Sequence, residues 1–215
     1  MVDAREITSK QKQIAVSEFF EKNKHFLGFD SLQRSLITAV KESVDNSLDA
    51  CEEARILPNI SVQIDRLKGD EIRLVTQDNG PGIPRDAVEH VFGKFLLGSR
   101  FHAIRQTRGQ QGIGITGVVM YSQLTTGVKT KVTSKIASDS SAVFVDIGLD
   151  TRKNRAIKSR EKRDVWFDDI TGEVVEHGLR IEARMKGKYQ RGKQSVFQYL
   201  RMTSIVNPHA TISLV

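Results

Sequence analysis

The sequence predicts an α+β protein in which a sheet is covered by helices on one face. Three observations predict this class: an early amphipathic helix, a hairpin of two alternating strands, and a run of strands after a glycine-rich loop and another helix. The chain has 215 residues, of which 39% are hydrophobic and 27% charged. This composition is sufficient for one large domain with a buried core.

The N-terminal part divides into an arm and a long helix. Residues 1–16 are polar, lack a full apolar face and are interpreted as an arm. Aromatic residues of the following segment, Phe20, Phe26 and Phe29 among them, are expected to be core or packing residues. A helix is predicted from Leu32 to Ala54, with Asp30 or Ser31 as its cap and Pro58 preventing its continuation.

A hairpin is predicted next, with alternating strands over 60–64 and 71–77 and a turn at 68–70. A short helix over 84–92 begins with proline, and residues 93–108 are interpreted as a long loop. A helix is predicted over 113–122. Later strands are expected at 130–134, 142–147, 179–183 and 211–215, with a helix over 195–206, whereas residues 152–176 receive no assignment.

Composition excludes several classes of protein. No stretch approaches the roughly 18 consecutive apolar residues of a membrane span, and the first residues lack a secretory signal, so we expect a location inside the cell. The single cysteine, Cys51, excludes an internal disulfide, and its place on an apolar helix face indicates packing in the core. A zinc cluster is not expected.

The positive charge is concentrated in one part of the chain. Residues 152–201 contain 14 Lys and Arg against seven Asp and Glu, while residues 1–151 contain 19 of each kind. A basic segment is typical of contact with nucleic acid, but a solvated loop explains it equally well. Both interpretations stay open at this point.

The predicted helix over 32–54 carries a polar stripe, which we define as Glu42, Asp45, Asn46 and Asp49. These residues are spaced i, i+3, i+4 and i+7, so they share one face of the helix. The stripe could simply face water. Alternatively, the carboxylate of Glu42 could deprotonate a water molecule, and the amide oxygen of Asn46 could bind Mg²⁺, which prefers oxygen ligands.

Two further polar groups follow. Asp78 ends a predicted strand and precedes a turn containing Gly80 and Gly82, where it could accept a hydrogen bond from the amine of an adenine, although a turn alone explains the glycines. The run 109–114 contains three glycines just before a helix. Such a loop can place backbone N–H groups against phosphate, but a flexible hinge is the alternative.

In their order and spacing, the three groups resemble the nucleotide-binding motifs of the GHKL ATPase superfamily. That resemblance narrows to the B subunits of archaeal type IIB DNA topoisomerases (topoisomerase VI). It is carried by residues 17–23, 41–54, 98–102, 108–114 and 205–210 and extends from about Ser17 to the end. It covers the ATPase domain, so we assign residues 17–215 to this domain and expect the helical insert and transducer domains of such subunits to be absent from the chain.

The resemblance implies a two-layer Bergerat α/β sandwich with a mixed, mostly antiparallel sheet. It implies that Glu42 is the general base, that Asn46 binds Mg²⁺ and that Asp78 accepts from the adenine of ATP. Gly80 and Gly82 would lie next to the adenine ring. A lid would enclose the triphosphate, formed by Ser99, Arg100, Arg108, Gly109, Gln110, Gln111, Gly112, Ile113 and Gly114.

The resemblance also implies partners. ATP binding would join two B subunits through the N-terminal arm, forming a gate for DNA passage, while a separate A subunit cuts the DNA; the protein would be cytoplasmic and associated with the nucleoid. The lysine that senses the γ-phosphate belongs to the transducer domain, so we expect slow hydrolysis by this chain alone. Leu179 stands where the family usually has threonine, so the hydroxyl that supports Asp78 is expected to be missing.

Two alternatives to this function stay open at this point. One is a module that binds nucleotide without hydrolysis, to hold a dimer, or that binds nucleic acid through its basic part. The other is a GHKL histidine kinase. Such kinases usually lack a base at the position of Glu42, so this residue favours an ATPase.

Overall fold

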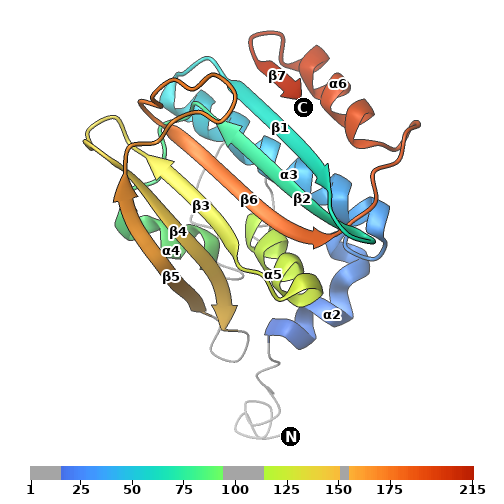
Figure 1. The fold of residues 1–215 in the computed structure, drawn as a ribbon. Coiled ribbons are helices and arrows are strands. Elements are labelled where there is room, and N and C mark those ends of the chain that lie inside the picture. Colours follow the sequence, from blue (N-terminus) through green and yellow to red (C-terminus); the bar gives the residue numbers. More distant parts are fainter. Residues whose placement is uncertain (1–15, 94–113, 151–154) are drawn as a thin grey trace, which may run out of the picture.

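The computed structural model describes residues 16–93, 114–150 and 155–215. In this part of the chain, seven strands form one sheet in the order β5-β4-β3-β6-β2-β1-β7. Every neighbouring pair is antiparallel except β1 and β7, which are parallel. Helices α3, α4 and α5 cover one face of this sheet (Figure 1). The predicted α+β class, the mixed sheet and the single helical layer are confirmed.

Helix α3 (Leu32–Ala54) has the predicted bounds. Ser31 is the N-cap, and its hydroxyl accepts from the backbone N–H of Arg34 at 3.3 Å. The helix ends at Arg55, whose φ of 58° is left-handed. Its apolar face, with Leu36, Val40, Val44, Leu48 and Cys51 fully buried, packs on the sheet.

Helix α2 (Val16–Leu27) precedes α3, and its orientation determines which of its aromatic side chains are buried in the core. Phe20 is fully buried, whereas Phe26 is 83% exposed, so its predicted place in the core is wrong. The two residues are six positions apart on a helix that turns about 100° per residue, so their side chains lie on different sides of it. Phe29 lies beyond the helix end and packs against the Tyr121 ring, with centroids 4.9 Å apart.

The hairpin β1 (Asn59–Arg66) and β2 (Glu71–Asp78) ends at Asp78, as predicted. Helix α4 (Arg85–Gly93) follows, and α5 (Gly114–Thr126) begins at the last glycine of the glycine group. Strands β3 (Thr130–Lys135), β4 (Ala142–Asp150) and β6 (Gly178–Lys186), helix α6 (Val196–Val206) and β7 (Thr211–Leu214) all lie at predicted positions.

Strand β5 (Arg155–Asp164), which was not predicted from the sequence, pairs with β4 at the edge of the sheet. Its side chains are mostly charged and exposed, so it lacks the apolar alternation that identifies a strand. Several of its cations pair with acids, as in Lys158 with Glu161 at 2.8 Å and Lys162 with Asp164 at 3.4 Å. Charged side chains on an edge strand oppose pairing with another chain, which gives this basic segment a structural role.

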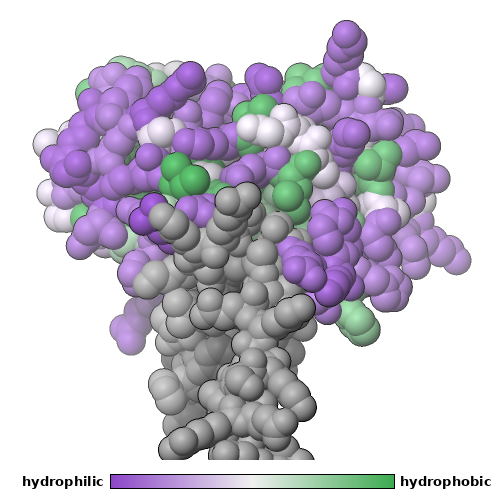
Figure 2. Space-filling view, turned by 90° about the horizontal axis from the view of Figure 1, so that it is seen from below, coloured by the Kyte–Doolittle hydropathy of each residue, from purple (hydrophilic) through white to green (hydrophobic). Residues whose placement is uncertain are grey.

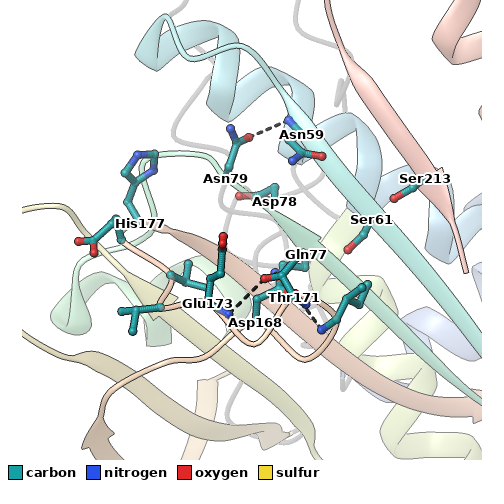
Figure 3. A pocket seen from close by; sticks show the side chains of 14 residues that line it. Asn59, Ser61, Gln77, Asp78, Asn79, Asp168, Thr171, Glu173, His177 and Ser213 are labelled. Carbon is teal, nitrogen blue, oxygen red and sulfur yellow. Dashed lines mark hydrogen bonds between the residues drawn. The ribbon is translucent and has the colours of Figure 1, made fainter.

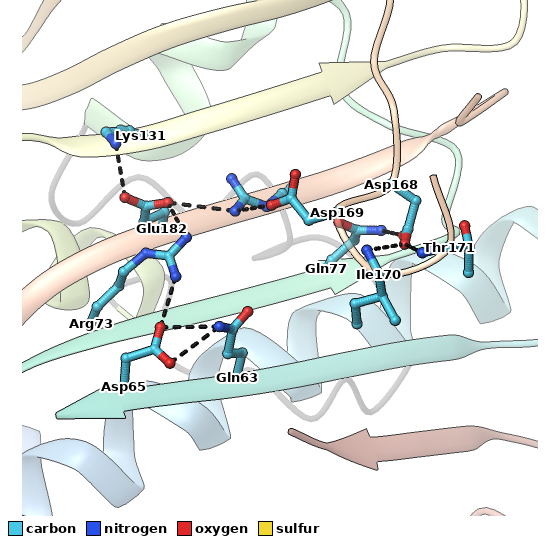
Figure 4. A network of polar contacts seen from close by, with 11 residues as sticks. Gln63, Asp65, Arg73, Gln77, Lys131, Asp168, Asp169, Ile170, Thr171 and Glu182 are labelled. Carbon is cyan, nitrogen blue, oxygen red and sulfur yellow. Dashed lines mark hydrogen bonds and ion pairs between the residues drawn. The ribbon is translucent and has the colours of Figure 1, made fainter. Parts of the chain in front are cut away.

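The face of the sheet away from the helices carries a charged network (Figure 4). Glu182 on β6 accepts from Arg73 at 2.9 Å and from Lys131 at 2.9 Å, and Arg73 also contacts Asp65 at 2.7 Å. Although burial by itself raises the pKa of Glu182, the hydrogen bonds from Arg73 and Lys131 lower it to about 2. The network therefore joins four neighbouring strands through ionised groups.

Seen from below Figure 1, the described surface is mostly hydrophilic, with hydrophobic residues in small groups (Figure 2). No helix among the described residues is both long and apolar enough to cross a bilayer.

Candidate functional site

Asp78 is one of the buried residues of the predicted site. It lies at the end of β2 and is 5% exposed. Its Oδ1 accepts from the backbone N–H groups of Gly80 at 2.9 Å and Leu179 at 3.2 Å, and its Oδ2 accepts from the hydroxyl of Ser47 at 2.6 Å. A carboxylate has about four acceptor positions. Described residues fill three of them, which leaves one for a ligand among the described contacts.

Ser47 supports Asp78 and was not among the site residues predicted from the sequence. The hydroxyl expected to be missing at Leu179 is supplied to Asp78 by Ser47 of α3, while Leu179 contributes its backbone N–H. A signal was present in the sequence, because Ser47 interrupts the apolar face formed by Val44, Leu48 and Cys51. A serine on a buried helix face needs a polar partner, and the acid at the end of β2 provides it.

Burial raises the pKa of Asp78 above its ordinary value, although the bonds from Ser47, Gly80 and Leu179 act in the opposite direction. The hydroxyl and the two N–H groups thus hold an acceptor in place within an apolar environment. The exocyclic amine of a ligand can donate a hydrogen bond to the fourth acceptor position of this carboxylate.

The turn after Asp78 depends on the backbone of two glycines. Gly82 has a φ of 72°, and a Cβ there would overlap the carbonyl oxygen of Lys135. The carbonyl of Gly80 accepts from Nδ1 of His177 at 2.9 Å. The turn therefore lies close against Lys135 of β3 and is bonded to His177, directly before β6.

Glu42 and Asn46 lie one turn apart on α3 and are both half-buried. Burial raises the pKa of Glu42, the charge of Lys41 opposes this effect, and the charge of Asp45 adds to it. The carboxylate lies against the first residue of α5, since a Cβ on Gly114 would overlap its Oε2. Glu42, the proposed general base, therefore lies at the N-terminus of α5. A helix N-terminus also favours the binding of a phosphate.

The structure thus places Glu42 and Asn46 of α3, Asp78, Gly80 and Gly82 of the β2 turn, and Gly114 of α5 around the same side of the sheet. The other predicted lid residues, at positions 99, 100 and 108–113, lie outside the described residues. Asp45 turns to another partner, and Asp49 is buried. The acceptor of Asp78 suits the amine of a base, and the helix N-terminus beside the Glu42 carboxylate suits phosphates.

A cavity of about 470 Å³ opens on the other face of the sheet, below the end of β2 (Figure 3). Gln77 and Ser61 point into it, and Asp168, Glu173 and Glu176 contribute three carboxylates. Asp78 also lines this cavity, but neither Glu42 nor Asn46 does. Carboxylates repel a triphosphate, so we place the candidate nucleotide site on the helical side of the sheet.

The chain is similar to known ATPases and to topoisomerase subunits. Residues 31–151 match the family model described as Histidine kinase-, DNA gyrase B-, and HSP90-like ATPase. The B subunits of type 2 DNA topoisomerase 6 are similar over nearly the whole chain. The protein from Methanosarcina acetivorans is 50% identical over 99% of this chain and 33% of its own length. The protein from Archaeoglobus fulgidus is 49% identical over 97% of this chain and 34% of its own length. The protein from Halobacterium salinarum is 46% identical over 98% of this chain and 26% of its own length. This chain thus spans about a third or less of the length of these relatives.

Proposed function

The chain belongs to the Histidine kinase-, DNA gyrase B-, and HSP90-like ATPase family, and from this membership we propose that it is the ATP-binding and ATP-hydrolysing domain of a type IIB DNA topoisomerase B subunit. The observation that carries the proposal is the position of Glu42 and Asn46 on the same side of the sheet as Asp78, whose carboxylate keeps one free acceptor position. The similarity to topoisomerase B subunits supports the finer assignment.

In the proposed reaction, Asp78 accepts a hydrogen bond from the adenine amine and Asn46 contributes an amide oxygen to Mg²⁺. The metal neutralises phosphate charge when it is bound. Glu42 would orient a water molecule and take its proton as the water attacks the γ-phosphorus, while the bond to the bridging oxygen breaks and ADP leaves with that oxygen. The raised pKa of Glu42, which results from burial, makes it a stronger base than an exposed glutamate.

Residues 99, 100 and 108–114 would close over the phosphates as a lid. We propose that closure joins two copies of the chain through the arm formed by residues 1–16. Hydrolysis would then reset this gate, and an A subunit would carry the DNA-cutting chemistry. The match to proteins named as B subunits supports this part of the proposal.

For DNA contact, we propose the C-terminal part of the basic segment 152–201. Residues 183–215 contain six Lys and Arg and no Asp or Glu. Lys188, Arg191 and Lys193 in this segment are exposed and form no ion pair with any described residue. The cations of β5, in contrast, largely pair with acids. We propose that residues 184–201 contact the DNA backbone.

Nucleotide binding is tested by calorimetric titration of the chain with a non-hydrolysable ATP analogue and Mg²⁺, with molecular mass measured in parallel. We expect binding and a shift towards the mass of a dimer. Glu42→Ala should bind the analogue like the wild type but hydrolyse no ATP. Absence of binding by the wild type would overturn the proposal, and binding without any turnover in a full-length B subunit would favour a non-hydrolysing module.

DNA contact is tested by the salt dependence of duplex binding. Each lost phosphate contact lowers the slope of log K against log salt by about 0.9. We therefore expect replacement of Lys188 and Arg191 by alanine to lower the slope by about two. The matched control replaces Lys158 and Arg160 of β5 and should leave it unchanged. Equal effects of the two pairs would contradict the assignment.

A further inference from the structure

Asp45 has no role in the chemistry described above, yet it is one of the most enclosed acids in the described part of the chain. It belongs to the polar stripe of α3, directly before Asn46 and three residues after Glu42. Its exposed fraction is 7%, whereas Glu42 and Asn46 are half-buried. A solvated helix face does not explain this burial.

Both carboxylate oxygens of Asp45 are held by other side chains. Oδ1 accepts from the hydroxyl of Tyr199 at 2.8 Å, and Oδ2 accepts from Nζ of Lys41 at 2.7 Å. Lys41 belongs to the preceding turn of α3. Tyr199 belongs to α6, which is 154 residues away in the chain. Asp45 is therefore the point where the last helix is bonded to the polar stripe.

The hydrogen bond between Asp45 and Tyr199 constrains α3 because α6, which carries Tyr199, is itself fixed. The N-cap Ser195 starts α6, and Val196 and Leu200 of the same helix are buried in the core. Tyr199 thus projects from a helix that is itself held in place. A buried carboxylate oxygen without a donor is costly, so the bond resists rotation of α3 about its axis. Such a rotation would carry Glu42 and Asn46 with it.

We propose that Asp45 is a positioning residue, which Tyr199 of α6 and Lys41 hold so that Glu42 and Asn46 face the bound Mg²⁺ and phosphates. This inference rests on the proposed nucleotide site and adds α6 to it. Tyr199 touches no reacting group. It acts through Asp45, and its removal changes the geometry of the phosphate end of the site and leaves the adenine end, at Asp78, intact.

The test uses Tyr199→Phe, which removes one hydroxyl and preserves the ring. The control is Tyr121→Phe on α5. The hydroxyl of Tyr121 also donates one intramolecular hydrogen bond, to the carbonyl of Lys186 at 3.0 Å, but this bond does not involve Asp45. For each protein, the affinity for a non-hydrolysable ATP analogue is measured with Mg²⁺ and with a chelator. The ratio of the two affinities reports on the metal end of the site.

We expect Tyr199→Phe to lower this ratio about tenfold, the effect of one lost hydrogen bond to a carboxylate. Tyr121→Phe should keep the wild-type ratio even where its melting temperature falls equally, because loss of stability alone does not change the ratio. Lys41→Met breaks the other bond of Asp45 and should act in the same direction, which provides a second variant if the first folds poorly.

A double-mutant cycle identifies the route. In an Asp45→Asn background, Tyr199→Phe should add little, since the two residues act as one unit. A wild-type ratio in Tyr199→Phe, or equal losses in the two tyrosine variants, would overturn the positioning role and leave the proposed function intact. Failure of the wild type itself to bind the analogue would overturn both.

Discussion

The substitution Asp78→Asn tests the adenine site most directly, because the structure specifies how the new amide must lie. Oδ1 accepts two backbone N–H groups, so the carbonyl oxygen of asparagine takes this position. The NH₂ group then replaces Oδ2 and faces Ser47, whose hydroxyl can rotate to accept. The fold is therefore expected to survive. Removal of a buried charge, whose cost is evident in the raised pKa of Asp78, partly offsets the weaker hydrogen bonds.

The ligand is affected more strongly than the fold. The amide presents a donor to the adenine amine, which is also a donor, so the hydrogen bond is lost. A hydrogen bond to a charged group contributes about 1.5–3 kcal/mol. This corresponds to a roughly 10- to 150-fold increase in Kd.

The assay is calorimetric titration with non-hydrolysable analogues of ATP and of inosine triphosphate, whose base carries an oxygen in place of the amine. The wild type should prefer the adenine analogue, and Asp78→Asn should prefer the inosine analogue, since its NH₂ group can donate to that oxygen. Ser61→Ala, on the other face of the sheet, is the control. Unchanged affinity and unchanged preference in Asp78→Asn would refute the position of Asp78 at the base.

Three further predictions follow from the geometry of the site and the sheet. Gly114→Ala places a methyl group on the Glu42 carboxylate, so hydrolysis by a full-length B subunit carrying the change should fall at least about tenfold. The control is Gly127→Ala, directly after α5, where a φ of 72° strains alanine but a Cβ meets no atom within 4 Å; equal turnover of the two variants in single-turnover assays would contradict the prediction. Because Glu42 acts when deprotonated and burial raises its pKa, turnover should rise with pH through a value above the ordinary 4.5, and a pH–rate profile with its acid limb at or below 4.5 would exclude Glu42 as the base. Glu182 has a lowered pKa of about 2, so its contribution to the free energy of unfolding is complete above 4.5 and is lost as the pH falls from 4.5 towards 2; Glu182→Gln should flatten the acid part of the stability curve measured by urea unfolding, and a curve parallel to that of the wild type would argue against the network.

The sequence by itself determined the elements whose signals are local. Helix α3 has its predicted bounds because its apolar period, the Ser31 cap and Pro58 all lie within or beside it. The hairpin that ends at Asp78 was predicted because alternation and a glycine turn are also local signals. The three polar groups were recognised by their order along the chain, and the family match confirms that resemblance.

Tertiary structure decided which groups meet from distant parts of the chain. Ser47 supports Asp78 only because α3 crosses the end of β2, and Tyr199 reaches Asp45 only because α6 packs beside α3. Strand β5 forms because β4 offers an edge, although its own residues carry no apolar alternation. These contacts depend on how helices and strands pack in three dimensions, and a pattern within one segment carries no information about its partner.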